Sequence, residues 1–118
     1  MDVQGVNALK LLGYAYATNG KVEEAIMVHE ALEALPALDP TIDRELEVYA
    51  ARRLAWLYVK SGRYADAVPK AQFFLQRADN DSDRAMSWLA LAHAYRALGQ
   101  DPEADDAVKR FLSLRGRG

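Results

Sequence analysis

The 118-residue sequence contains no cysteine, only two histidines and no long hydrophobic run. Without cysteine, neither a disulfide framework nor a thiolate metal site can form. Its longer uncharged stretches, such as residues 85–95, are far shorter than the roughly 20 apolar residues of a membrane-spanning helix. The net charge is −2, with acidic and basic residues interspersed, so no basic field attracts nucleic acid. We therefore expect one soluble, cytoplasmic domain over residues 1–118, with no membrane insertion and no nucleic-acid partner.

The sequence also lacks the motifs of catalysis. It has neither a Gly-rich phosphate loop nor a nucleophile elbow. His29 and Glu30 begin like a zinc-protease motif, but Glu33 stands where the second histidine belongs. We therefore interpret His29 as a polar residue on a helix face. No enzyme activity, no cofactor and no metal site are expected.

One spacing occurs three times in the chain. A leucine and a small residue are followed by a tyrosine four positions after the leucine, a glycine four positions later and an alanine five positions after that. The leucine and tyrosine share one helix face, and the glycine suits the left-handed conformation that ends a helix. Each copy therefore predicts a helix–turn–helix unit. The three copies are Leu12-Gly13, Tyr16, Gly20 and Ala25; Leu54-Ala55, Tyr58, Gly62 and Ala67; and Leu91-Ala92, Tyr95, Gly99 and Ala104.

This spacing resembles the tetratricopeptide repeat. The resemblance implies an all-α fold in which three tandem tetratricopeptide helix-turn-helix repeats stack in a right-handed superhelix with a concave groove. We expect the repeats at about residues 5–38, 41–79 and 82–115. The six expected helices span about residues 2–19, 22–35, 40–60, 64–78, 83–98 and 101–114.

Prolines shape the expected boundaries. Pro36 and Pro40 should close the second helix, with Pro40 in the first turn of the third. This lengthened third helix would explain why 42 residues separate Gly20 from Gly62, whereas 37 separate Gly62 from Gly99. Pro69 predicts a kink in the fourth helix. The sixth helix should cap the stack through an inward stripe of Ala104, Val108, Phe111 and Leu112.

The first helix of each repeat should line the concave face. The Leu–Tyr pairs are expected to be used in packing, so the neighbouring stripe should face a peptide ligand. Aromatic residues and cations converge on this stripe without a carboxylate, which suits a peptide with apolar anchors and acidic character. The predicted groove residues are Asn7, Lys10, Tyr14, Tyr49, Arg52, Trp56, Met86, Leu89, His93 and Arg96, accompanied by Ala17 and Val59.

Two aromatic residues leave alternatives open. Trp56 is predicted to be the central anchor of the groove. In the alternative, Trp56 and Tyr49 are buried in the core. Trp88 is expected to be a packing residue. The first helix carries only Lys10 as a charge between Val3 and Gly20, so we expect its apolar surface to be covered by a partner or by a second copy in a homodimer.

A narrower resemblance covers nearly the whole chain. The residues that carry it are Leu11-Leu12-Gly13-Tyr14-Ala15-Tyr16, Gly20, Ala25, Glu30-Ala31-Leu32, Arg53-Leu54-Ala55-Trp56-Leu57-Tyr58 and Trp88-Leu89-Ala90-Leu91-Ala92. With these residues the sequence resembles the small chaperones of bacterial type III secretion, of the YscY type. The resemblance implies a chaperone that holds a small secreted or export-apparatus partner in the bacterial cytosol. The alternative is a generic scaffold or adaptor that mediates protein–protein interaction or self-association.

Overall fold

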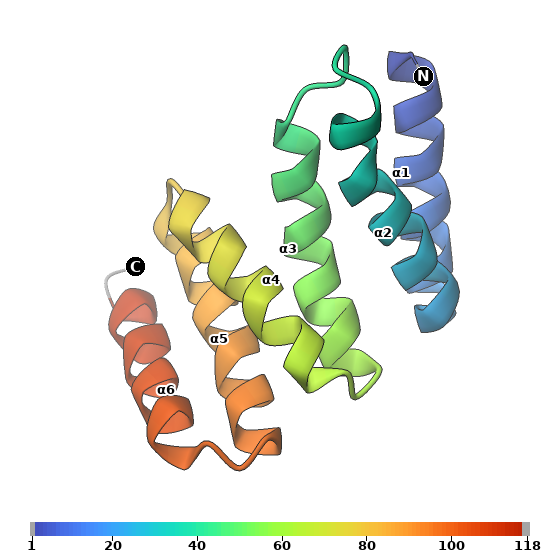
Figure 1. Cartoon of the computed structure of the whole chain (residues 1–118). Helices are drawn as coiled ribbons and strands as arrows, with labels where there is room; N and C mark the ends of the chain where they lie inside the picture. The colour runs from blue at the N-terminus through green and yellow to red at the C-terminus, as the bar shows by residue number, and fades with distance from the viewer. Residues whose placement is uncertain (1, 117–118) are drawn as a thin grey trace.

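The computed structural model describes residues 2–116, and these residues form six α-helices and no strand. Each helix packs on the next one along the chain, and α3 also packs on α5. The helices form three antiparallel pairs in an elongated stack with the two termini at opposite ends (Figure 1). The predicted all-α fold of three stacked helix pairs is confirmed. The helices are α1 (Val3–Thr18), α2 (Val22–Leu38), α3 (Glu45–Lys60), α4 (Tyr64–Arg77), α5 (Asp81–Ala97) and α6 (Asp101–Arg115).

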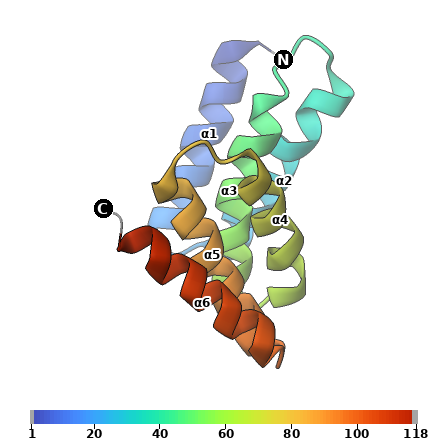
Figure 2. The same cartoon turned by 90° about the vertical axis from the view of Figure 1, so that its left-hand side faces the viewer.

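The two helices of each pair lie on different sides of the stack. A quarter turn of the molecule shows α1, α3 and α5 along one side and α2 and α4 along the other (Figure 2). The stripe that the sequence predicted as a groove lies on the first helices, so the layering places its three parts on one side of the molecule. Figure 1 looks mainly onto the second helices.

The three turn glycines have the backbone conformation that the sequence predicts. Gly20, Gly62 and Gly99 have φ values of 74°, 78° and 76°, in the left-handed region where a side chain is strained. In each repeat the residue after the glycine donates its backbone N–H to the carbonyl oxygen of the motif tyrosine, at 2.8, 2.8 and 2.9 Å. This bond satisfies a carbonyl that the end of the helix leaves free. The repeated glycine therefore ends the first helix of each pair.

The motif alanines lie on the buried face of the second helix in each pair. Ala25, Ala67 and Ala104 are all fully buried, as expected from their small size. Leu54 is also fully buried, in a cluster with Ala25 and Ile26 of the preceding repeat. A motif leucine therefore packs backwards onto the second helix of the repeat before it.

Leu12 is an exception to the predicted packing of the motif leucines. It is 42% exposed, whereas its counterparts Leu54 and Leu91 are buried. The reason is that, among residues 2–116, no helix packs on α1 from the side opposite α2. The prediction that the Leu12 side chain is taken up by packing was therefore wrong, and the outer face of α1 is left open.

The boundary between the first two repeats also differs from the prediction. Helix α2 runs through Pro36 to Leu38, and α3 begins at Glu45 instead of Pro40. Pro36 is buried, and burial of this segment offsets the backbone hydrogen bond that proline removes. The Asp39 carboxylate accepts bonds from the N–H and hydroxyl of Thr41 at 3.0 and 2.6 Å, which forms a turn in place of a helix cap.

The longer first spacing has a different cause from the one predicted. Helix α2 is three residues longer than α4, and the linker before α3 is three residues longer than the linker before α5. Helix α3 is one residue shorter than α5. The extra residues thus lie in α2 and its linker, not in a lengthened α3.

The last helix buries less than predicted. Ala104 and Ala107 face inward and are buried, but Val108 and Leu112 are exposed, Leu112 at 59%. In the second repeat the position equivalent to Val108 is Ala71, which is buried. That position faces the next repeat, and no repeat follows α6 within the described residues. The inward stripe predicted for α6 was wrong at Val108 and Leu112.

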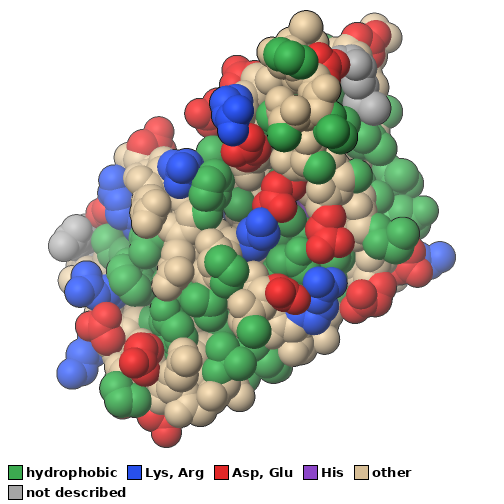
Figure 3. Space-filling view, viewed as in Figure 1, with side chains coloured by type: hydrophobic (Ala, Val, Ile, Leu, Met, Phe, Trp, Pro, Cys, Tyr) green, Lys and Arg blue, Asp and Glu red, His purple; other side chains and the backbone are tan. Residues whose placement is uncertain are grey.

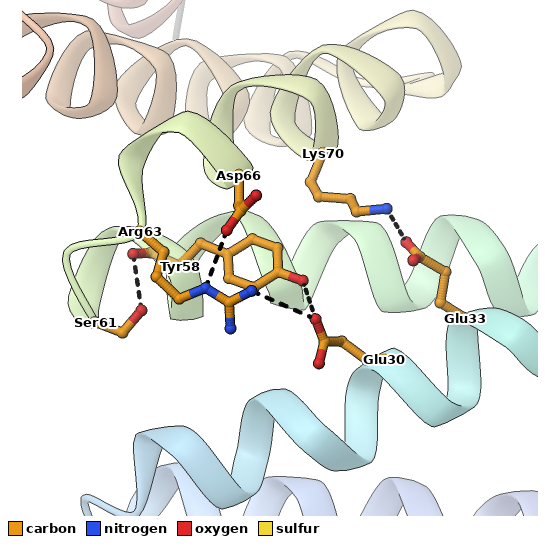
Figure 4. Close-up of polar contacts among 7 residues, drawn as sticks. All are labelled: Glu30, Glu33, Tyr58, Ser61, Arg63, Asp66 and Lys70. Atoms are coloured by element: carbon orange, nitrogen blue, oxygen red, sulfur yellow. Dashed lines mark hydrogen bonds and ion pairs between the residues drawn. The ribbon is translucent and has the colours of Figure 1, made fainter.

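Charged side chains join the first repeat to the second. The Tyr58 hydroxyl donates to the Glu30 carboxylate at 2.6 Å, and the Arg63 guanidinium lies 3.7 Å from the same carboxylate (Figure 4). Arg63 also pairs with Asp66 at 3.0 Å. Glu30 therefore links α2 to α3 and to the turn before α4.

A second ion pair reinforces this junction. Glu33 on α2 and Lys70 on α4 lie 2.6 Å apart (Figure 4). The space-filling view shows charges of both signs gathered where α2 meets α4, while hydrophobic side chains lie along the edge that α1 forms (Figure 3). The exterior of the second helices is therefore polar at the repeat junction, while α1 carries the exposed apolar side chains Val3, Leu11, Leu12 and Tyr14.

Candidate functional site

The predicted groove contains a central pocket of about 280 Å³ around α3. Three of the predicted residues line this pocket: Arg52 and Trp56 on α3 and Met86 on α5. Arg53 and Lys60, which the sequence analysis did not select, also line it. The pocket combines an aromatic ring and a thioether with cationic side chains.

A second pocket of about 650 Å³ opens between the first turns of α1 and α3. Asn7, Lys10 and Tyr49 line it, so three more predicted residues come together here. The Lys10 ammonium lies 4.4 Å from the centre of the Tyr49 ring, within cation–π range. The acidic residues Asp2, Asp43 and Glu45 also line this pocket.

The other predicted residues lie outside these two pockets. His93 contacts Trp56 edge to face, with 5.9 Å between ring centres. Tyr14 is well exposed on α1, and Leu89 is partly buried on α5. Arg96 contacts α6. The ten residues therefore form two clusters and a few separate positions instead of one continuous stripe.

Carboxylates approach the predicted cations, contrary to the expectation from the sequence. The Arg52 guanidinium lies 3.6 Å from the Asp83 carboxylate of α5. The Arg96 guanidinium contacts Asp101 at 2.9 Å and Asp105 at 2.7 Å, both on α6. Asp83 lies far from Arg52 in the sequence, and Asp101 and Asp105 lie on a different helix from Arg96. The residues of the stripe alone could therefore not reveal these ion pairs. The prediction that no carboxylate converges there was wrong.

The two tryptophans have different surroundings. Trp56 is partly buried against a cluster that includes Ala55, Ala90 and Leu91, and it borders the central pocket. Trp88 packs on the same cluster, but the Arg110 guanidinium lies 5.0 Å from its ring centre. Trp88 is thus a packing residue between α5 and α6. Trp56 combines partial burial with access to the pocket, and its role as an anchor stays a prediction.

His29 is the residue that sequence reasoning misplaced. It is only 1% exposed and lies in the core, not on a polar helix face. Its Nδ1 is 2.8 Å from the carbonyl oxygen of Ala25, and Nε2 has no hydrogen-bond partner. Burial lowers the pKa of His29 below its ordinary value, with a smaller contribution from the nearby Arg53. Its ring stacks on Tyr49 at 6.2 Å and also lines the central pocket.

A comparison of the repeats could have located His29. It stands nine residues after the turn glycine, where the other repeats have Ala71 and Val108. Ala71 is buried because a repeat follows it, and a repeat also follows His29, so the register with Ala71 indicates an inward position. The pattern of polar and apolar residues in α2 did not indicate that His29 is buried, because histidine is counted as a polar residue.

Two kinds of site are absent from the described part of the chain. Within residues 2–116, no three acidic or histidine side chains lie close enough to hold a metal ion. In the same residues, no helix is both long and apolar enough to cross a membrane.

Family models and known proteins add one finding. Residues 87–117, which cover most of α5 and all of α6, match the family model of the tetratricopeptide repeat. The third helix pair is therefore similar to a tetratricopeptide repeat. The same helix–turn–helix geometry recurs in the other two pairs, with the same glycine turn. Comparison with curated proteins and with solved structures gave no match. Tetratricopeptide repeats are protein-interaction modules, and this supports a general role in protein–protein interaction.

Proposed function

We propose that the chain binds a peptide segment of a protein partner on its first helices. We further propose that it acts as a chaperone that holds a small secreted or export-apparatus partner in the bacterial cytosol, as in type III secretion. The general role follows from the repeat architecture. The export system is suggested by the resemblance of the sequence to YscY-type chaperones.

The central pocket is the observation that carries the proposal. Trp56 and Met86 supply adaptable apolar contact, and Arg53 and Lys60 supply positive charge beside it. Interface energy concentrates where an aromatic side chain in a pocket is desolvated by the partner. A peptide with an apolar anchor and neighbouring acidic residues matches this lining.

The outer face of α1 supports a chaperone in particular. Leu11 is 70% exposed, and Val3 and Tyr14 are also well exposed on this helix. Exposed apolar surface of this kind is typical of an interface. A partner that covered α1 as well as the groove would bury it.

Self-association through α1 is the second candidate, and the same exposed leucines favour it. The generic scaffold or adaptor would then form a homodimer without a dedicated partner. The two candidates differ in solution. Light scattering on the chain alone and on a co-expressed complex separates them, because only the chaperone should change from a poorly behaved or dimeric form to a defined complex.

Paired tryptophan variants test the groove. A pull-down from the native host followed by mass spectrometry identifies the partner, and its affinity is then measured. Trp56→Ala should weaken binding by at least about 2 kcal/mol, roughly thirtyfold, while the repeats stay folded. Trp88→Ala is the matched control: it should lower the melting temperature without changing affinity per folded molecule. A large loss of stability in Trp56→Ala with unchanged affinity would overturn the groove assignment.

A further inference from the structure

The first repeat departs from the other two at one pair of facing positions. His29 replaces the Ala71 and Val108 of the later repeats, and Gly13 replaces their Ala55 and Ala92. A Cβ atom on Gly13 would lie 2.6 Å from Cε1 of His29, which is closer than real contacts allow. The missing side chain of Gly13 therefore makes room for the imidazole.

The hydrogen bonding of His29 fixes which nitrogen carries the proton. The Ala25 carbonyl oxygen can only accept, so Nδ1 must donate to it across 2.8 Å. In a neutral ring Nε2 then carries a lone pair and acts as an acceptor. This acceptor is buried and has no partner. An unsatisfied buried acceptor destabilises a fold, so a hydrogen-bond donor that reached this nitrogen would be favourable.

The unpartnered imidazole belongs to the wall of the central pocket. His29 lines the pocket together with Ala17 of α1 and with Arg53 and Trp56 of α3. The Arg53 guanidinium lies 5.1 Å from the Tyr49 ring centre, and the same side chain lines the pocket. The pocket lining therefore combines apolar side chains, the imidazole and cations.

This combination selects the side chain that can enter. Arg52, Arg53 and Lys60 line the pocket and repel a cationic donor such as lysine or arginine. Serine and threonine donate from a short side chain that brings little apolar surface to the apolar lining of the pocket. A tyrosine carries its donor at the far end of a flat apolar ring.

We propose that the central pocket is a tyrosine subsite, in which a tyrosine of the partner protein donates its hydroxyl hydrogen to Nε2 of His29. The subsite rests on the proposed groove and specifies one residue of the peptide that the groove takes. The first repeat, through Gly13 and His29, sets this specificity, while Trp56 and Met86 supply contact for the ring.

The experiment uses the full chain and two probes that differ only in the donor. The probe p-cresol has a phenolic hydroxyl, and 4-methylanisole has the same ring without a donor. Nitrogen-15 NMR should show p-cresol shifting the Nε2 resonance of His29 and binding about fivefold more tightly than 4-methylanisole, as one net hydrogen bond provides. In His29→Phe, which keeps an aromatic ring, the preference for p-cresol should disappear.

A second variant covers a failure of His29→Phe to fold. The double variant Gly13→Ala with His29→Ala reproduces the pair of residues in the second repeat, and it should also lose the preference. Equal binding of both probes to the unaltered chain, with the His29 resonance unmoved, overturns the subsite but leaves the groove intact. If neither probe moves the Trp56 or Met86 signals, the pocket takes no aromatic ring and the subsite is likewise overturned. The groove itself is then judged separately by the affinity of Trp56→Ala for the identified partner.

Discussion

Replacing Tyr58 with Phe removes one oxygen atom from the junction between the first and second repeats. The Tyr58 hydroxyl donates to the Glu30 carboxylate at 2.6 Å, and hydrogen bonds to charged groups contribute about 1.5–3 kcal/mol. Glu30 is 43% exposed and keeps Arg63 at 3.7 Å, so water and the guanidinium replace part of the lost bond. We therefore expect Tyr58→Phe to lower the free energy of unfolding by about 1.5 kcal/mol, near the lower end of this range.

The repeat architecture supplies a matched control for this change. Tyr95 occupies the same motif position in the third repeat, and its hydroxyl oxygen accepts a bond from the Gln72 amide at 3.0 Å on the exposed surface. Tyr95→Phe should cost only about 0.5 kcal/mol, because both groups are neutral and solvated.

Thermal unfolding followed by circular dichroism at neutral pH measures the difference. For a chain of this length about 1 kcal/mol corresponds to roughly 4 °C, so Tyr58→Phe should lower the melting temperature by about 6 °C. A double-mutant cycle with Glu30→Ala should give a coupling of about 1 kcal/mol. Equal effects of Tyr58→Phe and Tyr95→Phe, with no coupling to Glu30, would refute the role assigned to this bond.

Four further measurements test other parts of the structure. Burial lowers the pKa of His29 below 6.5, so the unfolded chain binds a proton at this residue more readily than the folded chain. The free energy of unfolding from urea titrations should therefore be constant above pH 6.5 and fall below it, and His29→Phe should reduce this fall. Burial and the bond to Glu30 raise the pKa of Tyr58 above 10.0, so stability should be full below pH 10 and fall above it, less steeply in Tyr58→Phe. Gly62→Ala should cost about 1 kcal/mol in denaturant unfolding because its φ is 78°, whereas Gly116→Ala, at φ −67°, should change stability little. Leu11→Lys should reduce any self-association seen by light scattering while leaving the melting temperature within about 2 °C; an unchanged association would exclude the α1 face as the contact.

Much of the fold was predictable because it depends on local geometry. The spacing of Leu54, Tyr58 and Gly62 specifies a helix face and a left-handed turn, and both involve residues within one or two helical turns. The same holds for Asp2, whose carboxylate accepts the Gly5 N–H at 2.8 Å and caps α1 as expected.

The linker between the repeats was not predictable from the same rules. Pro36 and Pro40 both signal a helix end, and the sequence alone does not weigh a lost backbone bond against the burial of Pro36. The groove was predictable only as a set of helix faces. Pairing of Arg52 with Asp83 and of Arg96 with α6 depends on contacts between helices.

By itself, the sequence determined a three-repeat helical stack, its turns and the charge-poor first helix. Each of these depends on residues that are close together along the chain. Only the tertiary structure decided that Leu12 is open, that Glu30 is tied to Tyr58, and that His29 is buried beside Gly13 with one nitrogen unpartnered. Those outcomes depend on which helix faces which, and on the absence of a neighbour before α1, because burial and hydrogen bonding between repeats are set by packing in space.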